Sequence, residues 1–205
     1  MKVLIIDYGM GNVGSVKRAI EECGVDNVIV SHHDYDFEDC THAILPGVGA
    51  FPDAMATLNE RGITDRIKKL AIDDKIPLLG ICLGMQLLAS KGTEVSFQDG
   101  LDLIPGIVQA LEPAIGERIP HVGWNEVQFT NRSDEMLNEI RDQSDFYFVH
   151  SYHFIPKNEE NILAYTPYAG KFVSMIRCGN IIGAQFHPEK SSTAGFQLLK
   201  NFLNI

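Results

Sequence analysis

The sequence predicts an α/β fold in which helices flank a central, mostly parallel β-sheet that carries added antiparallel strands. Two observations support this prediction. Up to residue 90, short apolar runs alternate with segments of helical periodicity, the pattern of a parallel sheet covered on both faces. After Gly92, short β-like runs follow one another with turns between them, as expected for antiparallel strands at one edge. We expect residues 1–205 to form one domain, because this length is ordinary for one.

The first part of the chain is expected to alternate strands and helices. Strands are predicted at residues 2–7, 27–31, 43–45 and 78–81, and helices at 13–22, 51–61, 63–72 and 83–89. The first strand ends in a turn at Gly9-Met10-Gly11, and the third ends in one at Pro46-Gly47-Val48-Gly49. The first turn lacks the third glycine of a dinucleotide-binding loop, so we exclude a nucleotide site there.

The second part is expected to be mostly β-structure. Strands are predicted at residues 107–111, 126–130, 146–150, 162–165, 172–177 and 181–186, followed by a last helix at 193–202. No apolar stretch approaches the ~20 residues that span a bilayer. The first residues do not resemble a signal peptide, because the apolar run is too short and soon acidic. We therefore expect a cytoplasmic protein.

Charge and cysteine content exclude several classes of partner. The net charge is −10 and the isoelectric point is about 5.1, whereas nucleic acids and anionic membranes bind basic patches. The four cysteines lack the paired spacing of a zinc site, so we expect no metal, and in the cytoplasm they should stay reduced. Cys23, Cys40 and Cys178 are interpreted as structural.

The remaining cysteine lies in the most informative motif of the chain. Cys82 stands in Gly80-Ile81-Cys82-Leu83-Gly84, between an apolar strand and a helical segment. This is the cysteine form of a nucleophile elbow, a sharp strand-to-helix turn that exposes one reactive side chain. Glycines on either side leave room for a strained backbone, and the helix N-terminus favours a thiolate. A buried, inert cysteine is the alternative, but the two glycines favour the nucleophile.

A base and an orienting acid are predicted at His187-Pro188-Glu189, directly after the last predicted strand. Pro188 keeps His187 extended, and in an extended segment residues i and i+2 point the same way. The Glu189 carboxylate can then hold one imidazole nitrogen while the other faces Cys82, as in a catalytic triad. The alternative is a structural histidine at a strand end, which we favour less because of the elbow.

Thioester chemistry also needs an oxyanion hole. One donor is expected to be the backbone N–H of Leu83, directly after the nucleophile. A second donor is expected from the loop Pro46-Gly47-Val48-Gly49, because its glycines allow a peptide N–H to turn toward the site. A plain turn without such a role is the alternative for this loop.

Two further polar residues are candidates for substrate contacts. Gln86 lies one helical turn after Cys82, where its amide could read a polar substrate or fill a gap in the core. Glu94 lies beyond the helix, where its carboxylate could pair with a substrate ammonium or remain solvated at the surface.

Together these motifs resemble those of the class I (triad) glutamine amidotransferases. The segments 80–86 and 185–189 are similar to the two signatures of that family. Within it, the glutaminase subunits of imidazole glycerol phosphate synthase are most similar, through segments 7–12, 46–49, 120–125 and 147–152. The resemblance extends from the first strand to the last helix. It implies the flavodoxin-like fold of the family.

The resemblance also implies a reaction. Cys82 would attack the side-chain amide of L-glutamine, His187 would move the protons, and water would resolve the γ-glutamyl thioester. In the family, Val48 and Leu83 donate to the oxyanion, and the reaction needs no metal or organic cofactor. The residues that would hold glutamine are Gln86, Glu94, Ser151 and Tyr152, together with the loop glycines Gly47 and Gly49.

A partner is implied as well. In the family, ammonia passes to a (βα)₈-barrel synthase subunit, and glutaminase activity stays low until that partner binds its ligand. The interface would carry Asn12, Trp124, Asn125 and Lys190, and we expect a cation–π contact between Trp124 and Lys190. The alternative for Trp124, the only tryptophan, is an ordinary place in the core.

Other functions share these motifs. Segments 112–119 and 91–93 depart from the family pattern, which leaves open a related glutaminase subunit that supplies a synthase amidinating surface sugars. A catalytically silent binding module is a second alternative, against which the intact Cys82, His187 and Glu189 argue. A γ-glutamyl hydrolase is a third, disfavoured by the motif around Trp124 and the small size of the chain.

Overall fold

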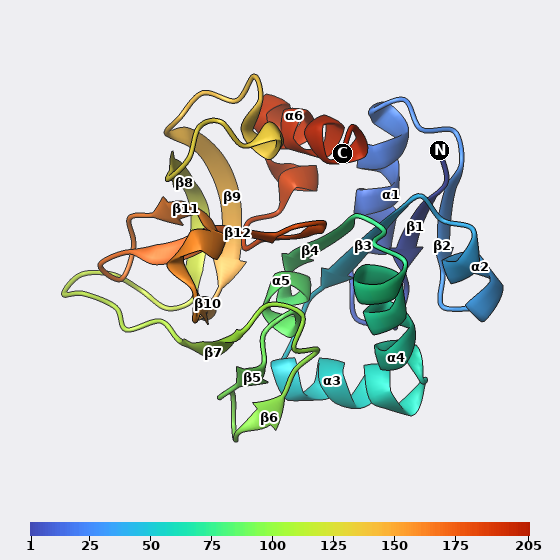
Figure 1. Cartoon of the computed structure of the whole chain (residues 1–205). Helices are drawn as coiled ribbons and strands as arrows, with labels where there is room; N and C mark the ends of the chain where they lie inside the picture. The colour runs from blue at the N-terminus through green and yellow to red at the C-terminus, as the bar shows by residue number, and fades with distance from the viewer.

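A nine-stranded sheet forms the centre of the computed structural model, which describes residues 1–205 (Figure 1). Its strand order is β2-β1-β3-β4-β13-β12-β11-β8-β9. The parallel part consists of β1 (Val3–Ile6), β2 (Val28–Ser31), β3 (His42–Gly47), β4 (Leu78–Cys82) and β13 (Ile181–Ala184). The antiparallel part consists of β12 (Phe172–Cys178), β11 (Ile162–Thr166), β8 (His121–Phe129) and β9 (Ser144–His150). The predicted fold class is thereby confirmed.

Helices cover both faces of the parallel part (Figure 1). Helices α1 (Val13–Glu22) and α6 (Ser192–Leu203) pack on one face, whereas α3 (Phe51–Glu60), α4 (Ile63–Lys68) and α5 (Leu83–Leu87) pack on the other. Along β1, Leu4 and Ile6 join the core under α3, and Val3 and Ile5 join the core under α1. This alternation follows from the two-residue period of a strand, and burial of both faces explains the continuous apolar runs.

A second, smaller sheet packs beside the first (Figure 1). It has four strands in the order β10 (Tyr152–Pro156), β7 (Gly106–Ala110), β5 (Lys91–Gly92) and β6 (Gln98–Asp99). Short helical segments complete the chain: α2 (Asp34–Glu38), a π-helical turn Lys69–Asp73, and 3₁₀ turns Glu135–Leu137, Glu159–Asn161 and Pro188–Lys190. No helix of the structure combines the length and the apolar character needed to cross a membrane.

The structure differs from the predicted elements in a few places. The helix expected over 63–72 stays α-helical only to Lys68 and continues as the π-helical turn. Strand β8 begins five residues earlier than expected, at His121 rather than 126. In its first half the apolar residues Val122 and Trp124 are exposed and Gly123 has φ 138°, so this part lacks the buried apolar run of the other strands. Strands β5 and β6 have only two residues each, too few for a periodic signal.

The fold brings the carboxyl ends of three neighbouring strands together. Gly47 at the end of β3 is paired with Cys82 at the end of β4, and Ala184 at the end of β13 is paired with Ile81. The loop after β3, the elbow after β4 and the segment Gln185–Glu189 after β13 therefore start from one edge of the sheet. Ligands of open α/β sheets bind at this edge.

Close packing of α5 against β3 makes Gly84 a testable constraint. A Cβ on Gly84 would overlap the Leu45 carbonyl oxygen, whereas a Cβ on Gly14 in α1 would meet no atom within 4 Å. We expect Gly84→Ala to lower the free energy of unfolding by about 1–3 kcal/mol or more through overpacking. Gly14→Ala should raise it by about 0.5 kcal/mol, because alanine favours a helix. Urea denaturation of both variants measures the difference, and equal effects would contradict the packing constraint.

Candidate active site

The elbow has the strained backbone that its sequence predicts. Cys82 connects β4 to α5 with φ 55° and ψ −112°, a conformation that costs a non-glycine residue about 1–3 kcal/mol. Gly80 and Gly84 permit the turn, because a Cβ on Gly80 would lie 2.7 Å from the Gly84 carbonyl oxygen. The surrounding packing holds the sulfur at the wall of a pocket, and the Cys82 residue is only 6% exposed.

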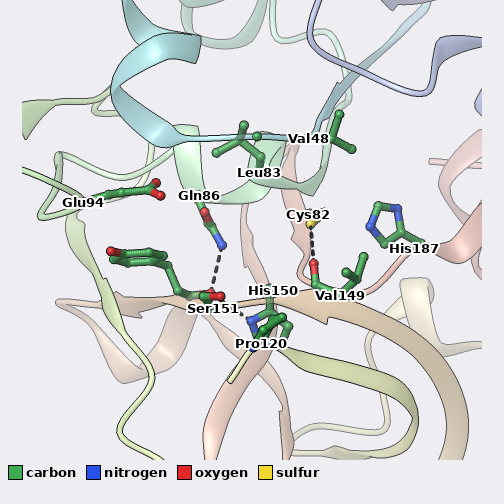
Figure 2. Close-up of a pocket in the computed structure, with 12 residues that line it drawn as sticks. Val48, Cys82, Leu83, Gln86, Glu94, Pro120, Val149, His150, Ser151 and His187 are labelled. Atoms are coloured by element: carbon green, nitrogen blue, oxygen red, sulfur yellow. Dashed lines mark hydrogen bonds between the residues drawn. The ribbon is translucent and has the colours of Figure 1, made fainter. Parts of the chain in front are cut away.

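The structure brings the three predicted triad residues together. His187 Nδ1 lies 2.9 Å from Glu189 Oε1, and both side chains are almost fully buried. The other ring nitrogen, Nε2, has no hydrogen-bond partner and points toward Cys82 (Figure 2). The Cys82 thiol lies 3.7 Å from the Val149 carbonyl oxygen, and the Gln185 amide donates to the sulfur at 3.7 Å. The imidazole thus faces the sulfur and is held from behind by the carboxylate.

A cavity of about 380 Å³ opens over the sulfur (Figure 2). Nine of the predicted site residues line it: Val48, Gly49, Cys82, Leu83, Gln86, Glu94, Ser151, Tyr152 and His187. Glu189 stands behind His187. Gly47 is not among the lining residues, and a Cβ built on it would lie 2.7 Å from the Tyr8 hydroxyl. The three segments that start from one edge of the sheet therefore meet Glu94 and the β9–β10 turn at one pocket.

Gln86 and Glu94 are each oriented by the protein. The Gln86 amide nitrogen donates to the Tyr152 carbonyl at 2.9 Å and to Gln185 Oε1 at 3.0 Å. This orientation leaves the Gln86 carbonyl oxygen as an acceptor. Glu94 Oε2 accepts the Phe51 N–H at 2.8 Å, at the N-terminus of α3, and its carboxylate group lies at the pocket (Figure 2). The cavity therefore offers a carboxylate and an amide oxygen for a cationic or polar substrate group.

Known proteins resemble this chain in sequence and in fold. The family model described as glutamine amidotransferase class-I matches residues 4–205. The chain belongs to this family. Among solved structures, that of PurLQS from Thermotoga maritima has the same fold, with a TM-score of 0.75 and 19% identity over 99% of this chain and 97% of that one.

Two curated relatives of this amidotransferase are similar over nearly its whole length. The imidazole glycerol phosphate synthase subunit HisH of Moorella thermoacetica is 47% identical over 98% of this chain and 93% of that protein. The imidazole glycerol phosphate synthase subunit HisH 1 of Prochlorococcus marinus is 44% identical over 99% of this chain and 97% of that protein.

The predicted oxyanion hole is incomplete in the structure. Leu83 is the first residue of α5, a position whose N–H has no acceptor within its helix. The Val48 N–H, however, donates to the Met10 carbonyl at 3.0 Å and does not point into the pocket. The expectation that Val48 donates to the oxyanion therefore does not hold in this geometry. Its backbone would have to turn first.

Electrostatics favour a protonated His187. Burial would lower the pKa of this imidazole, but the Cys82 sulfur and the Glu189 carboxylate outweigh burial and raise the pKa to about 9. Because the folded-state pKa exceeds the ordinary value of 6.5, the protonated ring stabilises the fold fully below pH 6.5. That contribution is lost as the pH rises through about 9. The protonated ring is thus placed as a proton donor that faces the Cys82 sulfur.

A chain of buried hydrogen bonds, which the sequence did not reveal, supports the far wall of the pocket. Asn125 Nδ2 lies 3.3 Å from His121 Nε2, and His121 Nδ1 lies 3.0 Å from His150 Nε2. His150 Nδ1 then lies 2.8 Å from the Tyr152 carbonyl oxygen. Because that carbonyl can only accept, His150 carries its proton on Nδ1, and the same must then hold for His121. Both rings are neutral. Through these hydrogen bonds His121 orients His150, and His150 holds the Tyr152 carbonyl oxygen in place.

The predicted interface residues lie outside the pocket, and one expected contact is different. Lys190 Nζ lies over the ring of Tyr147, 5.9 Å from its centroid, rather than over Trp124. Tyr147 is paired with Trp124 across β9 and β8, and the two rings meet edge to face at 6.1 Å. The tryptophan is 54% exposed, so it is not a core residue. Asn12 is the N-cap of α1 and accepts the Ser15 N–H.

Nitrogen-15 NMR of the histidine side chains tests these assignments. His187 should titrate with a pKa of about 9, and Glu189→Gln should lower this pKa by removing the stabilising carboxylate. His150 should stay neutral as the Nδ1–H tautomer wherever the protein is folded, because burial lowers its pKa to about 3. A protonated His150 at neutral pH, or a His187 pKa that Glu189→Gln leaves unchanged, would contradict the assigned network.

Proposed function

We propose that this chain is the glutaminase subunit of an imidazole glycerol phosphate synthase in histidine biosynthesis. It hydrolyses L-glutamine to glutamate and ammonia, and passes the ammonia to a (βα)₈-barrel synthase subunit in the cytoplasm. The observation that carries the proposal is the buried pair His187 and Glu189, 2.9 Å apart, facing a strained Cys82 in the pocket. The names and full-length similarity of the relatives support the choice of pathway.

The pocket suits glutamine as the substrate. Glu94 offers a carboxylate for the α-ammonium group, and the Gln86 carbonyl oxygen offers an acceptor. The backbone of Ser151 and Tyr152 lines the opposite wall and is fixed by the histidine links. Ammonium binding and backbone contacts at fixed positions would place the side-chain amide over the sulfur, which supplies the orientation that catalysis requires.

The reaction then follows from the triad. The Cys82 thiolate attacks the amide carbon, and the tetrahedral oxyanion forms beside the Leu83 N–H. Protonated His187 gives its proton to the amide nitrogen, the C–N bond breaks, and ammonia leaves a γ-glutamyl thioester. Neutral His187 next takes a proton from water, which attacks the thioester. The C–S bond breaks, glutamate is released, and the thiolate and imidazolium are restored.

The resting loop explains why a partner would be needed. While the Val48 N–H is held by Met10, the oxyanion hole has one donor from the elbow and lacks its second. Loss of one such donor costs roughly 10²–10³ in kcat. Gly47 precedes Val48, and a glycine gives the peptide between the two residues the freedom to turn. A partner that favours the turned loop would activate the subunit.

An exposed apolar surface supports the proposed interface for the synthase. Val122, Trp124 and Val149 on β8 and β9 are exposed, and Val149 also lines the pocket. Apolar side chains gathered at the mouth of an active site mark a docking surface. Lys190 stands beside these strands at the 3₁₀ turn, whereas the Asn125 side chain on β8 turns to His121, away from the face that carries Trp124. Ammonia released at Cys82 would therefore emerge under the partner.

The cysteine variant tests the proposal in the complex with the synthase. Cys82→Ser should abolish glutamine-dependent synthesis, because serine is a much weaker nucleophile here, while synthesis from added ammonium salts survives. Cys178→Ser is the control: it removes an exposed thiol that does not line the pocket, and it should change neither rate. Glutamate release and product formation are measured together.

Two outcomes would count against the proposal. Retained glutamine hydrolysis in Cys82→Ser would rule out the thioester. Co-purification with a synthase that amidinates sugars, instead of one that makes imidazole glycerol phosphate, would contradict the proposed pathway. The cysteine mechanism of glutamine hydrolysis would be unaffected by that result.

A further inference from the structure

Tyr8 carries a buried hydroxyl that the chemistry so far does not use. It follows β1 and is 1% exposed, yet its hydroxyl oxygen has no hydrogen-bond partner. Buried hydroxyl groups are nearly always hydrogen-bonded, because an unpaired one loses its water without replacement. An unpaired hydroxyl beside an active site therefore calls for a partner in another state of the protein.

The hydroxyl lies against the oxyanion loop. A Cβ built on Gly47 would lie 2.7 Å from the Tyr8 oxygen, so the hydroxyl occupies the space beside Gly47 where a side chain would be. Burial, and secondarily the charge of the nearby Cys82 sulfur, raise the pKa of Tyr8 well above its usual range, so it remains a donor. Met10, whose carbonyl accepts the Val48 N–H, lies two residues after Tyr8 on the loop that follows β1.

The geometry of one peptide connects these observations. In a trans peptide the N–H and the C=O point in opposite directions. The Val48 N–H and the Gly47 C=O belong to one such peptide, and the N–H now points at the Met10 carbonyl. If the peptide turns so that the N–H faces the pocket, the Gly47 oxygen takes the direction that the N–H has now, toward Met10 and the loop after β1 that also carries Tyr8. The Met10 carbonyl cannot satisfy it, because both groups are acceptors.

We propose that Tyr8 is a positioning residue whose hydroxyl donates to the Gly47 carbonyl when the Val48 N–H turns into the oxyanion hole. The inference deepens the proposed glutaminase function and rests on it. The hydroxyl is unpaired in the resting loop and paired in the turned loop, so it lowers the free energy of the turned loop relative to the resting one. It touches neither glutamine nor the sulfur in this role.

Tyr8→Phe in the complex with the synthase tests the proposal. We expect kcat for glutamine to fall about 5- to 10-fold, the effect of one neutral hydrogen bond, with an unchanged KM. Ammonia-dependent synthesis should be unaffected. The melting temperature of the free subunit should stay the same or rise, because the variant removes an unpaired buried hydroxyl. Tyr35→Phe, which removes an exposed hydroxyl on α2, is the matched control and should change none of these.

The two readouts separate this role from a structural one. A lower melting temperature with unchanged kcat would show that Tyr8 only supports the fold and would overturn the inference. Equal kcat in wild type and Tyr8→Phe would overturn it while leaving the glutaminase function intact. Absence of glutamine hydrolysis in the wild-type complex would overturn the proposed function and this inference together.

Discussion

The close approach of α5 to β3 and β4 is the constraint on which the site depends. A side chain on Gly84 would overlap the Leu45 carbonyl oxygen. On the other side of the elbow, a side chain on Gly80 would overlap the Gly84 carbonyl oxygen. This packing holds Cys82 at φ 55°, a conformation that the residue would not adopt alone. The sulfur is therefore placed by the core, and so is the N–H of Leu83, before any substrate binds. The remaining groups are arranged around this fixed point.

The site is complete in one respect and incomplete in another. Proton transfer is pre-arranged, because Glu189 holds His187 and Gln185 donates to the sulfur. Stabilisation of the oxyanion is not, because the Val48 N–H is bound elsewhere. In the proposed mechanism, the turn of a single peptide separates the resting site from a competent one. Such an arrangement lets a partner regulate the reaction with little structural change, since only a group with two alternative hydrogen-bond partners has to switch.

Sequence patterns were sufficient for the parts that depend on local or periodic signals. The apolar runs of β1, β3 and β4 and the paired glycines around Cys82 indicated the sheet and the elbow, and Pro188 indicated the geometry of His187 and Glu189. The orientation of the peptide between Gly47 and Val48 depends on two backbone torsions, which no sequence pattern specifies. The links through His121 and His150 depend on the register of β8 against β9. That register also puts Tyr147, rather than Lys190, beside Trp124.

Alkylation of Cys82 by iodoacetamide gives the most direct test of the central claim. The claim is that the cysteine–histidine pair is already formed in the free subunit and that the partner completes only the oxyanion hole. Displacement of iodide needs a thiolate but forms no oxyanion. In the free subunit we expect Cys82 to react readily, at a rate that His187→Ala lowers, although glutamine turnover is slow. The ligand-bound synthase should raise turnover without raising the alkylation rate, with peptide mapping to separate Cys82 from the exposed Cys178. A parallel rise of both rates would contradict a pre-formed cysteine–histidine pair.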